Sequence, residues 1–313
     1  MTRKYLTILF VMTITLVSAQ IKIVNKLTVD HQNVEGTKIS LIPPNGFTKA
    51  VNFLGFQEEV SGSSIMVLNI PGPFSETSKG ITKENLLSTG VQMISDDHIL
   101  LNGLPALLVQ GKQSAYGNIY TKYILVFGTE KETIMINGVF PEHLTKLSGD
   151  IKKCLLSAYY EAEKQVNILE TVEYTIEVSG TKLKFAGNMS NSLIYTVDGE
   201  LPTKSDDKTS LIISKSFSNA NTEDLKDFSI NRLKQTPFEV DSIKRSADIV
   251  IGDLSGYEII SKGKNIKTGV PEYLYQLILP TDSNYYILFG TTNDMSEVSI
   301  NEIKKAAETF KLK

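Results

Sequence analysis

The second half of this 313-residue chain repeats landmarks of the first half in the same order. Gly36-Thr37-Lys38-Ile39 returns as Gly180-Thr181-Lys182-Leu183, and Asp150-Ile151-Lys152-Lys153 returns as Glu302-Ile303-Lys304-Lys305. Between these landmarks the offset drifts by only a few residues, as insertions in loops would produce. A period this long is typical of duplicated whole domains and not of a solenoid built from short units. The sequence therefore predicts two copies of one domain in tandem.

Copy one is expected to span residues 20–165, and copy two is expected to span residues 170–313. Hydrophobic periodicity predicts the elements of each copy. In copy one it predicts strands near 39–42, 65–70, 104–110, 119–127 and 133–140, a helix from Thr82 to Ile94 and a closing helix around Ile151. In copy two it predicts strands near 210–213, 256–261, 272–279 and 285–291, a helix from Thr222 to the break at Pro237 and a closing helix around Ile303.

The segments 119–127 and 285–289 are apolar on both alternating faces, which a sheet exposed to water on one side would not tolerate. Short polar turns, such as Gly128-Thr129-Glu130-Lys131, join consecutive strands and indicate antiparallel hairpins. The predicted fold class is therefore α+β, with an antiparallel sheet covered by helices on both faces and built twice.

Three features of copy one resemble PsbP, an extrinsic protein of photosystem II, and small exported bacterial proteins with PsbP-like domains. They are the turn Pro43-Pro44-Asn45-Gly46-Phe47, the run Asn102-Gly103-Leu104-Pro105-Ala106 before the central strands, and the closing helix around Ile151. The resemblance extends to both copies and so to nearly the whole chain after residue 19. Because PsbP-like proteins are mostly accessory proteins without known catalysis, it implies a binding or assembly role.

Residues 1–19 have the pattern of a secretory signal peptide. Arg3 and Lys4 precede an apolar run from Tyr5 to Val17, and the small residues Ser18 and Ala19 follow. The run is shorter than the roughly 18 apolar residues that a membrane-spanning helix needs, so cleavage is favoured over an uncleaved anchor. The expected location is secreted or periplasmic, with no integral membrane span after cleavage.

Charge and cysteine content exclude some classes of partner and linkage. Without Arg3 and Lys4, 30 basic residues face 35 acidic ones, a formal net charge of -5. Such a chain lacks the broad basic surface that binds phosphate backbones, so no nucleic acid partner is expected. Cys154 is the sole cysteine and cannot form an internal disulfide. Its helical surroundings predict a buried core residue and not a reactive thiol.

The sequence contains no local signature of a catalytic, metal or cofactor site. The histidines His31, His98 and His143 are far apart and none occurs in a paired ligand spacing. Asp96-Asp97-His98 is the densest polar group, and it is interpreted as a solvated turn after a helix in preference to a metal or proton-transfer site. No catalytic residue, metal or cofactor is predicted.

These observations favour an exported, non-catalytic accessory or binding protein that contacts another protein or an envelope component. Whether the chain catalyses anything stays open. One alternative is a hydrolase whose site assembles only on folding, and it predicts a concave pocket with several titratable groups of shifted pKa. Another is a small-ligand carrier, which predicts a large apolar cavity between sheet and helix.

One hairpin differs between the copies in charge. The segment Ser261 to Gly269 carries Lys262, Lys264 and Lys267 and no acidic residue, whereas its counterpart in copy one carries one charge. Clustered lysines accelerate encounter with anionic partners, so these three residues are the candidate partner-binding site. The alternative is a solvated loop whose lysines keep a sheet edge from pairing with other chains, and that reading is favoured.

Overall fold

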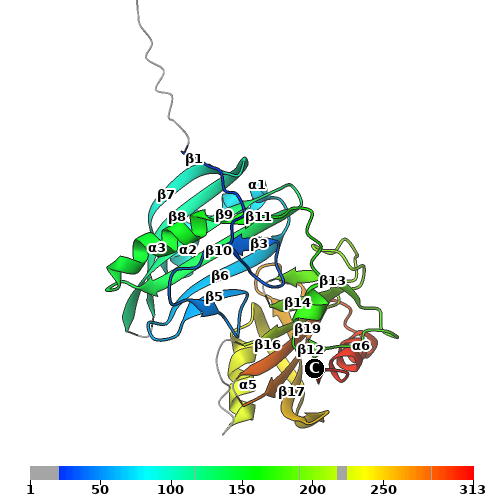
Figure 1. The fold of residues 1–313 in the computed structure, drawn as a ribbon. Coiled ribbons are helices and arrows are strands. Elements are labelled where there is room, and N and C mark those ends of the chain that lie inside the picture. The colour runs from blue at the N-terminus through cyan, green and yellow to red at the C-terminus, as the bar shows by residue number, and fades with distance from the viewer. Residues whose placement is uncertain (1–20, 116, 190, 217–223, 283) are drawn as a thin grey trace, which may run out of the picture.

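The computed structural model describes residues 21–115, 117–189, 191–216, 224–282 and 284–313. Two large sheets dominate it (Figure 1). Within the first sheet, all neighbouring strands are antiparallel except β1 and β7, which are parallel. The strand order of the first sheet is β1 (Ile21–Ile23), β7 (Val91–Leu101), β8 (Leu104–Ala115), β9 (Asn118–Gly128), β10 (Glu132–Pro141), β6 (Ser63–Pro71), β5 (Gly55–Glu58) and β4 (Thr48–Lys49).

The second sheet is antiparallel throughout. Its order is β16 (Phe238–Ile251), β17 (Leu254–Asn265), β18 (Pro271–Pro280), β19 (Tyr285–Thr292), β15 (Ser210–Lys215), β14 (Ser192–Thr196) and β13 (Lys184–Met189). Starting from β7 and from β16, the two sheets connect their seven strands in the same sequence order. The boundaries at 20–165 and 170–313 stay predictions.

Short strands and helices complete the described part of the chain. The small strands are β2 (Gln32–Asn33), β3 (Ile39–Leu41), β11 (Tyr159–Tyr160), β12 (Tyr174–Thr175) and β20 (Lys311–Leu312). The helices are α1 (Phe74–Thr77), the 3-10 helix η1 (Ser78–Gly80), α2 (Lys83–Ser88), α3 (Thr145–Leu156), α4 (Ile168–Thr171), α5 (Leu225–Lys234) and α6 (Glu297–Ala307). No described helix is long and apolar enough to cross a membrane.

The closing helices α3 and α6 each press an isoleucine against a glycine of the adjoining sheet. A Cβ atom placed on Gly138 of β10 would lie 2.5 Å from Cγ2 of Ile151, and one on Gly290 of β19 would lie 2.4 Å from Cγ2 of Ile303. Real Cβ atoms do not approach other atoms this closely, so only glycine lets each helix sit at this depth. The repeated isoleucine landmark therefore marks the same helix-to-sheet contact in both halves.

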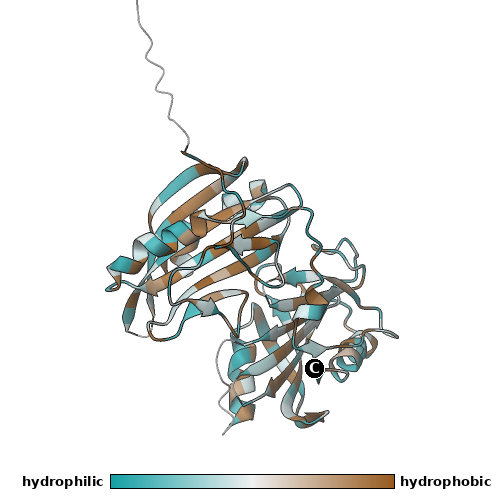
Figure 2. Ribbon diagram, in the orientation of Figure 1, coloured by the Kyte–Doolittle hydropathy of each residue, from teal (hydrophilic) through white to brown (hydrophobic). Residues whose placement is uncertain are grey.

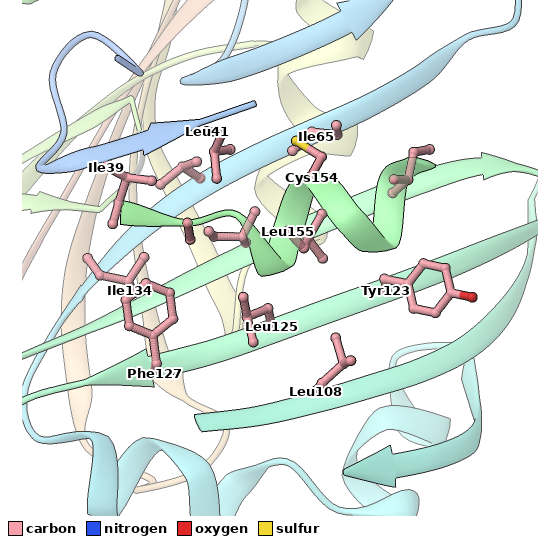
Figure 3. Close-up of a cluster of buried hydrophobic side chains, with 14 of the residues drawn as sticks. Ile39, Leu41, Ile65, Leu108, Tyr123, Leu125, Phe127, Ile134, Cys154 and Leu155 are labelled. Atoms are coloured by element: carbon pink, nitrogen blue, oxygen red, sulfur yellow. The ribbon is translucent and has the colours of Figure 1, made fainter. Parts of the chain in front are cut away.

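The main core of copy one lies between α3 and the first sheet (Figure 3). Leu125, Phe127 and Ile134 of the sheet surround Leu155 and Cys154 of α3, all almost fully buried. A smaller cluster on the opposite face gathers Leu107, Val109, Ile124 and Val126 under α1, η1 and α2. Figure 2 shows the hydrophobic residues concentrated along the central strands.

The antiparallel sheets predicted from the sequence are confirmed, and the chain is mixed α and β. Complete helical cover of both faces is not shown. In copy one the helices on the second face have only four, three and six residues, so strand outweighs helix. The apolar residues on both faces of the central strands correctly predicted that both faces are covered. Loops and small strands, and not helices alone, provide part of that cover.

The prediction of a helix from Thr82 to Ile94 is wrong in its second half. Helix α2 ends at Ser88, and Gly90 follows with a φ of 81°, a left-handed conformation that commonly terminates helices. Val91 to Leu101 then forms β7, so Asp96-Asp97-His98 lies within a strand and not in a turn. The spacing of Val91 and Ile94 suits one face of a helix, but pairing along β8 makes the segment a strand, with Val91 buried and Ile94 exposed.

Two predictions concern residues outside the described ranges. The signal peptide at 1–19 lies there, and so does the expected helix start at Thr222. The described helix α5 begins at Leu225 behind Asp224, whose side chain accepts a hydrogen bond from the Asp227 amide. An aspartate cap of this kind satisfies an amide that the first turn leaves free.

Cys154 is buried in the core, and burial raises the pKa of its thiol to about 12. Because the thiolate is the reactive form, we expect no reaction with Ellman's reagent at about pH 8 in the folded protein. After denaturation, one thiol per chain is expected to react at once. Rapid reaction of the folded protein would show that α3 opens readily from the sheet, contrary to its packing.

Candidate functional site

A groove of about 660 Å³ lies between the two large sheets. It is a concave site whose lining comes from both sheets, and binding sites commonly form in such clefts. Its lining consists of residues 33–37 and 49–55 of copy one, residues 164–168 and 170–174 of the connection, and Asn191, Lys215 and Tyr286 of copy two.

Direct contacts between the two halves hold the groove in shape. The side-chain amide of Asn191 donates to the carbonyl oxygens of Asn52 and Lys215, both at 3.1 Å, and so bridges copy one and copy two. Strand β13 lies next to β6. On the other side, a Cβ at Gly36 would lie 3.1 Å from Oγ1 of Thr171, which places the turn at Gly36 directly on α4.

The loop of residues 50–54 forms one wall of the groove because of Gly55. The Ala50 amide donates to the Gly55 carbonyl at 3.0 Å, which closes the loop. Gly55 has a φ of 149°, and a Cβ there would lie 1.9 Å from the backbone oxygen of Ile65. No other residue fits this position. The closed loop leaves the side chain of Val51 68% exposed.

Charges in the groove are largely paired within the protein. Lys49 pairs with Glu35, and Lys215 Nζ lies 2.5 Å from Glu173 Oε2. The side chain of Lys215 is only 11% exposed, so its charge depends on Glu173. Three lysines and three glutamates line the groove in total, which leaves it without a dominant charge.

Two buried tyrosines are among the residues that line the groove. The Tyr286 hydroxyl donates to Glu173 Oε2 at 3.4 Å, and the Tyr174 hydroxyl donates to the Ile213 carbonyl at 3.2 Å. Burial raises the pKa of Tyr286 to about 12, with a further contribution from the charge of Glu173. Burial also raises the pKa of Tyr174. Both phenols therefore keep their protons at neutral pH and act as hydrogen-bond donors.

The structure places the three candidate lysines outside the lining of the groove, along β17 and the turn that follows. Lys262 Nζ lies over the ring of Tyr273, 4.6 Å from its centroid, and Lys264 Nζ lies 2.9 Å from Glu239 Oε2 of β16. Lys267 is exposed at the turn. Two of the three ammonium groups are thus engaged by neighbouring strands, and they do not form one free basic tip. Their role in partner binding stays a prediction.

The histidines are separate in space as well as in sequence. His31 Nε2 lies 3.0 Å from the Ser157 carbonyl, His98 lies within β7, and His143 follows β10. Among the residues that the structure describes, no three His, Cys, Asp or Glu side chains are grouped to hold a metal.

Sequence reasoning missed the groove altogether. Asn191 and Asn52 meet across a separation of 139 residues, and neither belongs to a motif. One available signal was Gly55, a lone glycine beside an apolar segment, which is typical of a close backbone approach.

Comparisons with known proteins give no family assignment. No protein-family model matches the chain, and no curated protein matches it. The apo structure of the T6SS immunity protein TplEi from Pseudomonas aeruginosa is 11% identical, with a TM-score of 0.35 over 88% of this chain and 95% of that chain. A Tle4-Tli4 complex is 9% identical, with a TM-score of 0.32 over 85% of this chain and 97% of that chain.

TplEi has also been solved in complex with an "L" peptide, and that structure is 8% identical with a TM-score of 0.30, over 91% of this chain and 98% of that chain. An immunity protein with a bound peptide and a two-protein complex are thus among the solved structures to which the chain is similar. At these TM-scores the likeness carries no argument about what this chain does. The PsbP-like resemblance is not tested by these comparisons.

Proposed function

We propose that the chain is an exported, non-catalytic binding protein whose groove between the two sheets receives a segment of a partner protein. The observation that carries the proposal is the groove itself. It has a volume of about 660 Å³ and lies between the two large sheets, with an exposed apolar side chain, Val51, on the loop that Gly55 closes.

The chemistry of the lining supports a polypeptide as the occupant. Apolar side chains such as Val51, Phe53 and Val166 alternate with polar ones, and the ion pairs of Lys49 and Lys215 are already satisfied within the protein. A site with balanced charges offers little to a polyanion, whose binding depends on uncompensated lysine and arginine. An uncharged or weakly charged protein segment fits this lining best.

The hydrolase alternative needs a base in the groove that accepts a proton near neutral pH. Tyr286 and Tyr174 do not supply one, since burial raises the pKa of both phenols and keeps them protonated. The location proposed for the protein is secreted or periplasmic, and the support for it is the signal-peptide pattern of residues 1–19.

Photo-crosslinking from two valines tests the proposed site. Val51 lines the groove, whereas Val60 is 96% exposed on the turn between β5 and β6 and lies outside it. A benzophenone amino acid at position 51 is expected to capture a protein from the native envelope or medium that position 60 does not capture. The captured protein is then purified and its affinity is measured directly.

With that purified partner, Val51→Arg is expected to weaken binding at least about tenfold, because a charged side chain would be buried in an apolar contact. Val60→Arg is expected to leave the affinity unchanged. Both side chains are exposed in the free protein, so neither change should affect folding. Equal capture from both positions, or unchanged affinity of the Val51→Arg variant, would contradict the proposal.

A further inference from the structure

The two sheets differ at one outer edge. In the first sheet, β1 pairs in parallel with the end of β7, with Ile21 opposite Ile99, Lys22 opposite Leu100 and Ile23 opposite Leu101. The Asn102 amide donates to the Ile23 carbonyl at 2.8 Å and completes the pairing. Strand β1 therefore covers the edge that β7 would otherwise leave open.

In the part of the chain that the structure describes, the same position in the second sheet is open. The hairpins of β7–β8 and β16–β17 close in the same register, with Leu101 opposite Leu104 and Ile251 opposite Leu254. Val250 therefore corresponds to Leu100. Within the described residues, no strand pairs with the outer edge of β16. The side chain of Val250 is 67% exposed, as expected for a position without its covering strand.

Only the last part of β16 is available for pairing. The register shifts between Val240 and Ser242 and again between Ile243 and Arg245, and bulges of this kind bend an edge away from partners. From Ser246 to Ile251 the pairing with β17 is regular. The open stretch therefore coincides with the stretch that β1 covers in the first sheet.

The side chains around this stretch define what would fit it. Ile249 and Ile251 contribute to the second core, as Ile23 contributes to the first, so an apolar residue added beside them would extend that core. The exposed carboxylates of Asp248 and Asp253 flank Val250. A basic residue opposite Val250 would therefore be favoured, which is the apolar-basic-apolar pattern of Ile21-Lys22-Ile23.

We propose that the edge at Ile249–Ile251 is a docking site for an extended segment of a partner protein with an apolar-basic-apolar sequence, added parallel to β16. The main-chain hydrogen bonds give such additions their affinity, and the alternate side chains give specificity. The site is separate from the groove, because β16 and β13 are opposite edges of the second sheet and the groove lies near β13.

A second copy of the chain is a poorer occupant, because its own β1 is tied down. The Asn25 side-chain amide donates to the carbonyls of Leu156 and Ala158, at 2.8 and 3.0 Å, and His31 binds the Ser157 carbonyl. Releasing β1 to reach another molecule would break these contacts. A segment from a different protein carries no such cost.

A peptide of residues 20–25, Gln-Ile-Lys-Ile-Val-Asn, is the probe for this site. Titrated into the isotope-labelled protein to millimolar concentration, it is expected to shift the backbone amide signals of residues 246–252. Because the Asn102 amide faces β1 and strand residues alternate, the Leu100 amide faces outward, and the Val250 amide is expected to do the same. Val250→Pro therefore removes an outward donor and no bond to β17.

Val250→Pro is expected to weaken peptide binding at least about fivefold, whereas Val250→Thr, which keeps the amide, is expected to bind as the parent does. Changing Asp248 and Asp253 together to Asn is expected to weaken binding at low salt and to flatten its salt dependence. Val51→Arg in the groove is expected to leave peptide binding unchanged, which separates this site from the proposed function.

Three results would overturn the proposal. The first is no amide shift at residues 246–252 at millimolar peptide, and the second is equal binding by Val250→Pro. The third is a mass in sedimentation that rises with protein concentration and returns to the monomer in Val250→Pro, which would assign this edge to self-association.

Discussion

Gly138→Ala and Gly290→Ala are each expected to lower the free energy of unfolding by about 2 to 3 kcal/mol. The added methyl group would lie 2.5 Å from Ile151 Cγ2 in the first case and 2.4 Å from Ile303 Cγ2 in the second. Both isoleucines are fully buried, so neither can turn away without moving its helix. Urea denaturation followed by far-ultraviolet circular dichroism measures the loss.

Gly149→Ala is the matched control, because Gly149 is exposed on α3 and an added methyl group there would meet no atom within 4 Å. Here alanine is expected to stabilise by about 0.5 to 1 kcal/mol through its helix propensity. Ile151→Leu removes the methyl group that meets Gly138, so it is expected to recover part of the loss in Gly138→Ala. If Gly138→Ala and Gly290→Ala lower the free energy of unfolding by no more than about 0.5 kcal/mol, as a surface substitution does, then α3 and α6 do not pack this closely on their sheets.

Glu258→Ala is expected to cost about 3 kcal/mol of stability, because Glu258 is a fully buried carboxylate in the second sheet. Its Oε2 accepts from Arg245 Nε at 2.6 Å and from Lys304 Nζ at 3.0 Å, so one side chain joins β16, β17 and α6. Removing it leaves a cavity and two cations without their shared partner. Chemical denaturation of the variant measures the loss.

Copy one supplies the control for this prediction. In the matching register, Leu108 stands where copy two has Glu258, and Ser95 stands where it has Arg245. Arg245 is half exposed and Lys304 keeps Glu308 at 3.7 Å, so an apolar side chain can replace the buried Glu258 without stranding a buried cation. The double variant Glu258→Leu with Arg245→Ser is therefore expected to lie within about 1 kcal/mol of the parent. If the double variant is as unstable as Glu258→Ala, the two copies are not equivalent at this position.

The strands that the sequence predicted correctly are those whose pattern admits one interpretation. Residues 119–127 are too apolar to lie anywhere but in a buried strand, and they form β9. The structure of Val91 to Leu101 was harder to predict, because Val91 and Ile94 are three residues apart, a spacing that is typical of a helix. The pairing of this eleven-residue strand with β8 is not visible in the local sequence. No element was predicted for the counterpart β16, whose pairing with β17 is likewise not visible in the local sequence.

For the candidate sites, the sequence shows the charged residues but not the residues that they contact. Lys262 and Lys264 stand out as charges in a sequence, but Tyr273 and Glu239 meet them only once the strands pair. The groove depends on the hydrogen bond from Asn191 to Asn52, which joins the two halves. The edge of β16 has no partner strand among the described residues, because β1 pairs with β7. None of these partners is close in sequence.

By itself, the sequence determined the repeat, the antiparallel strands and the positions of the closing helices, because periodicity and turn residues act over a few neighbouring residues. Only the tertiary structure decided where the two halves touch, which lysines have partners on neighbouring strands and, among the described residues, which sheet edge has no partner strand. These properties depend on contacts between residues far apart in the chain, and their energies are set by burial and pairing that no local pattern records.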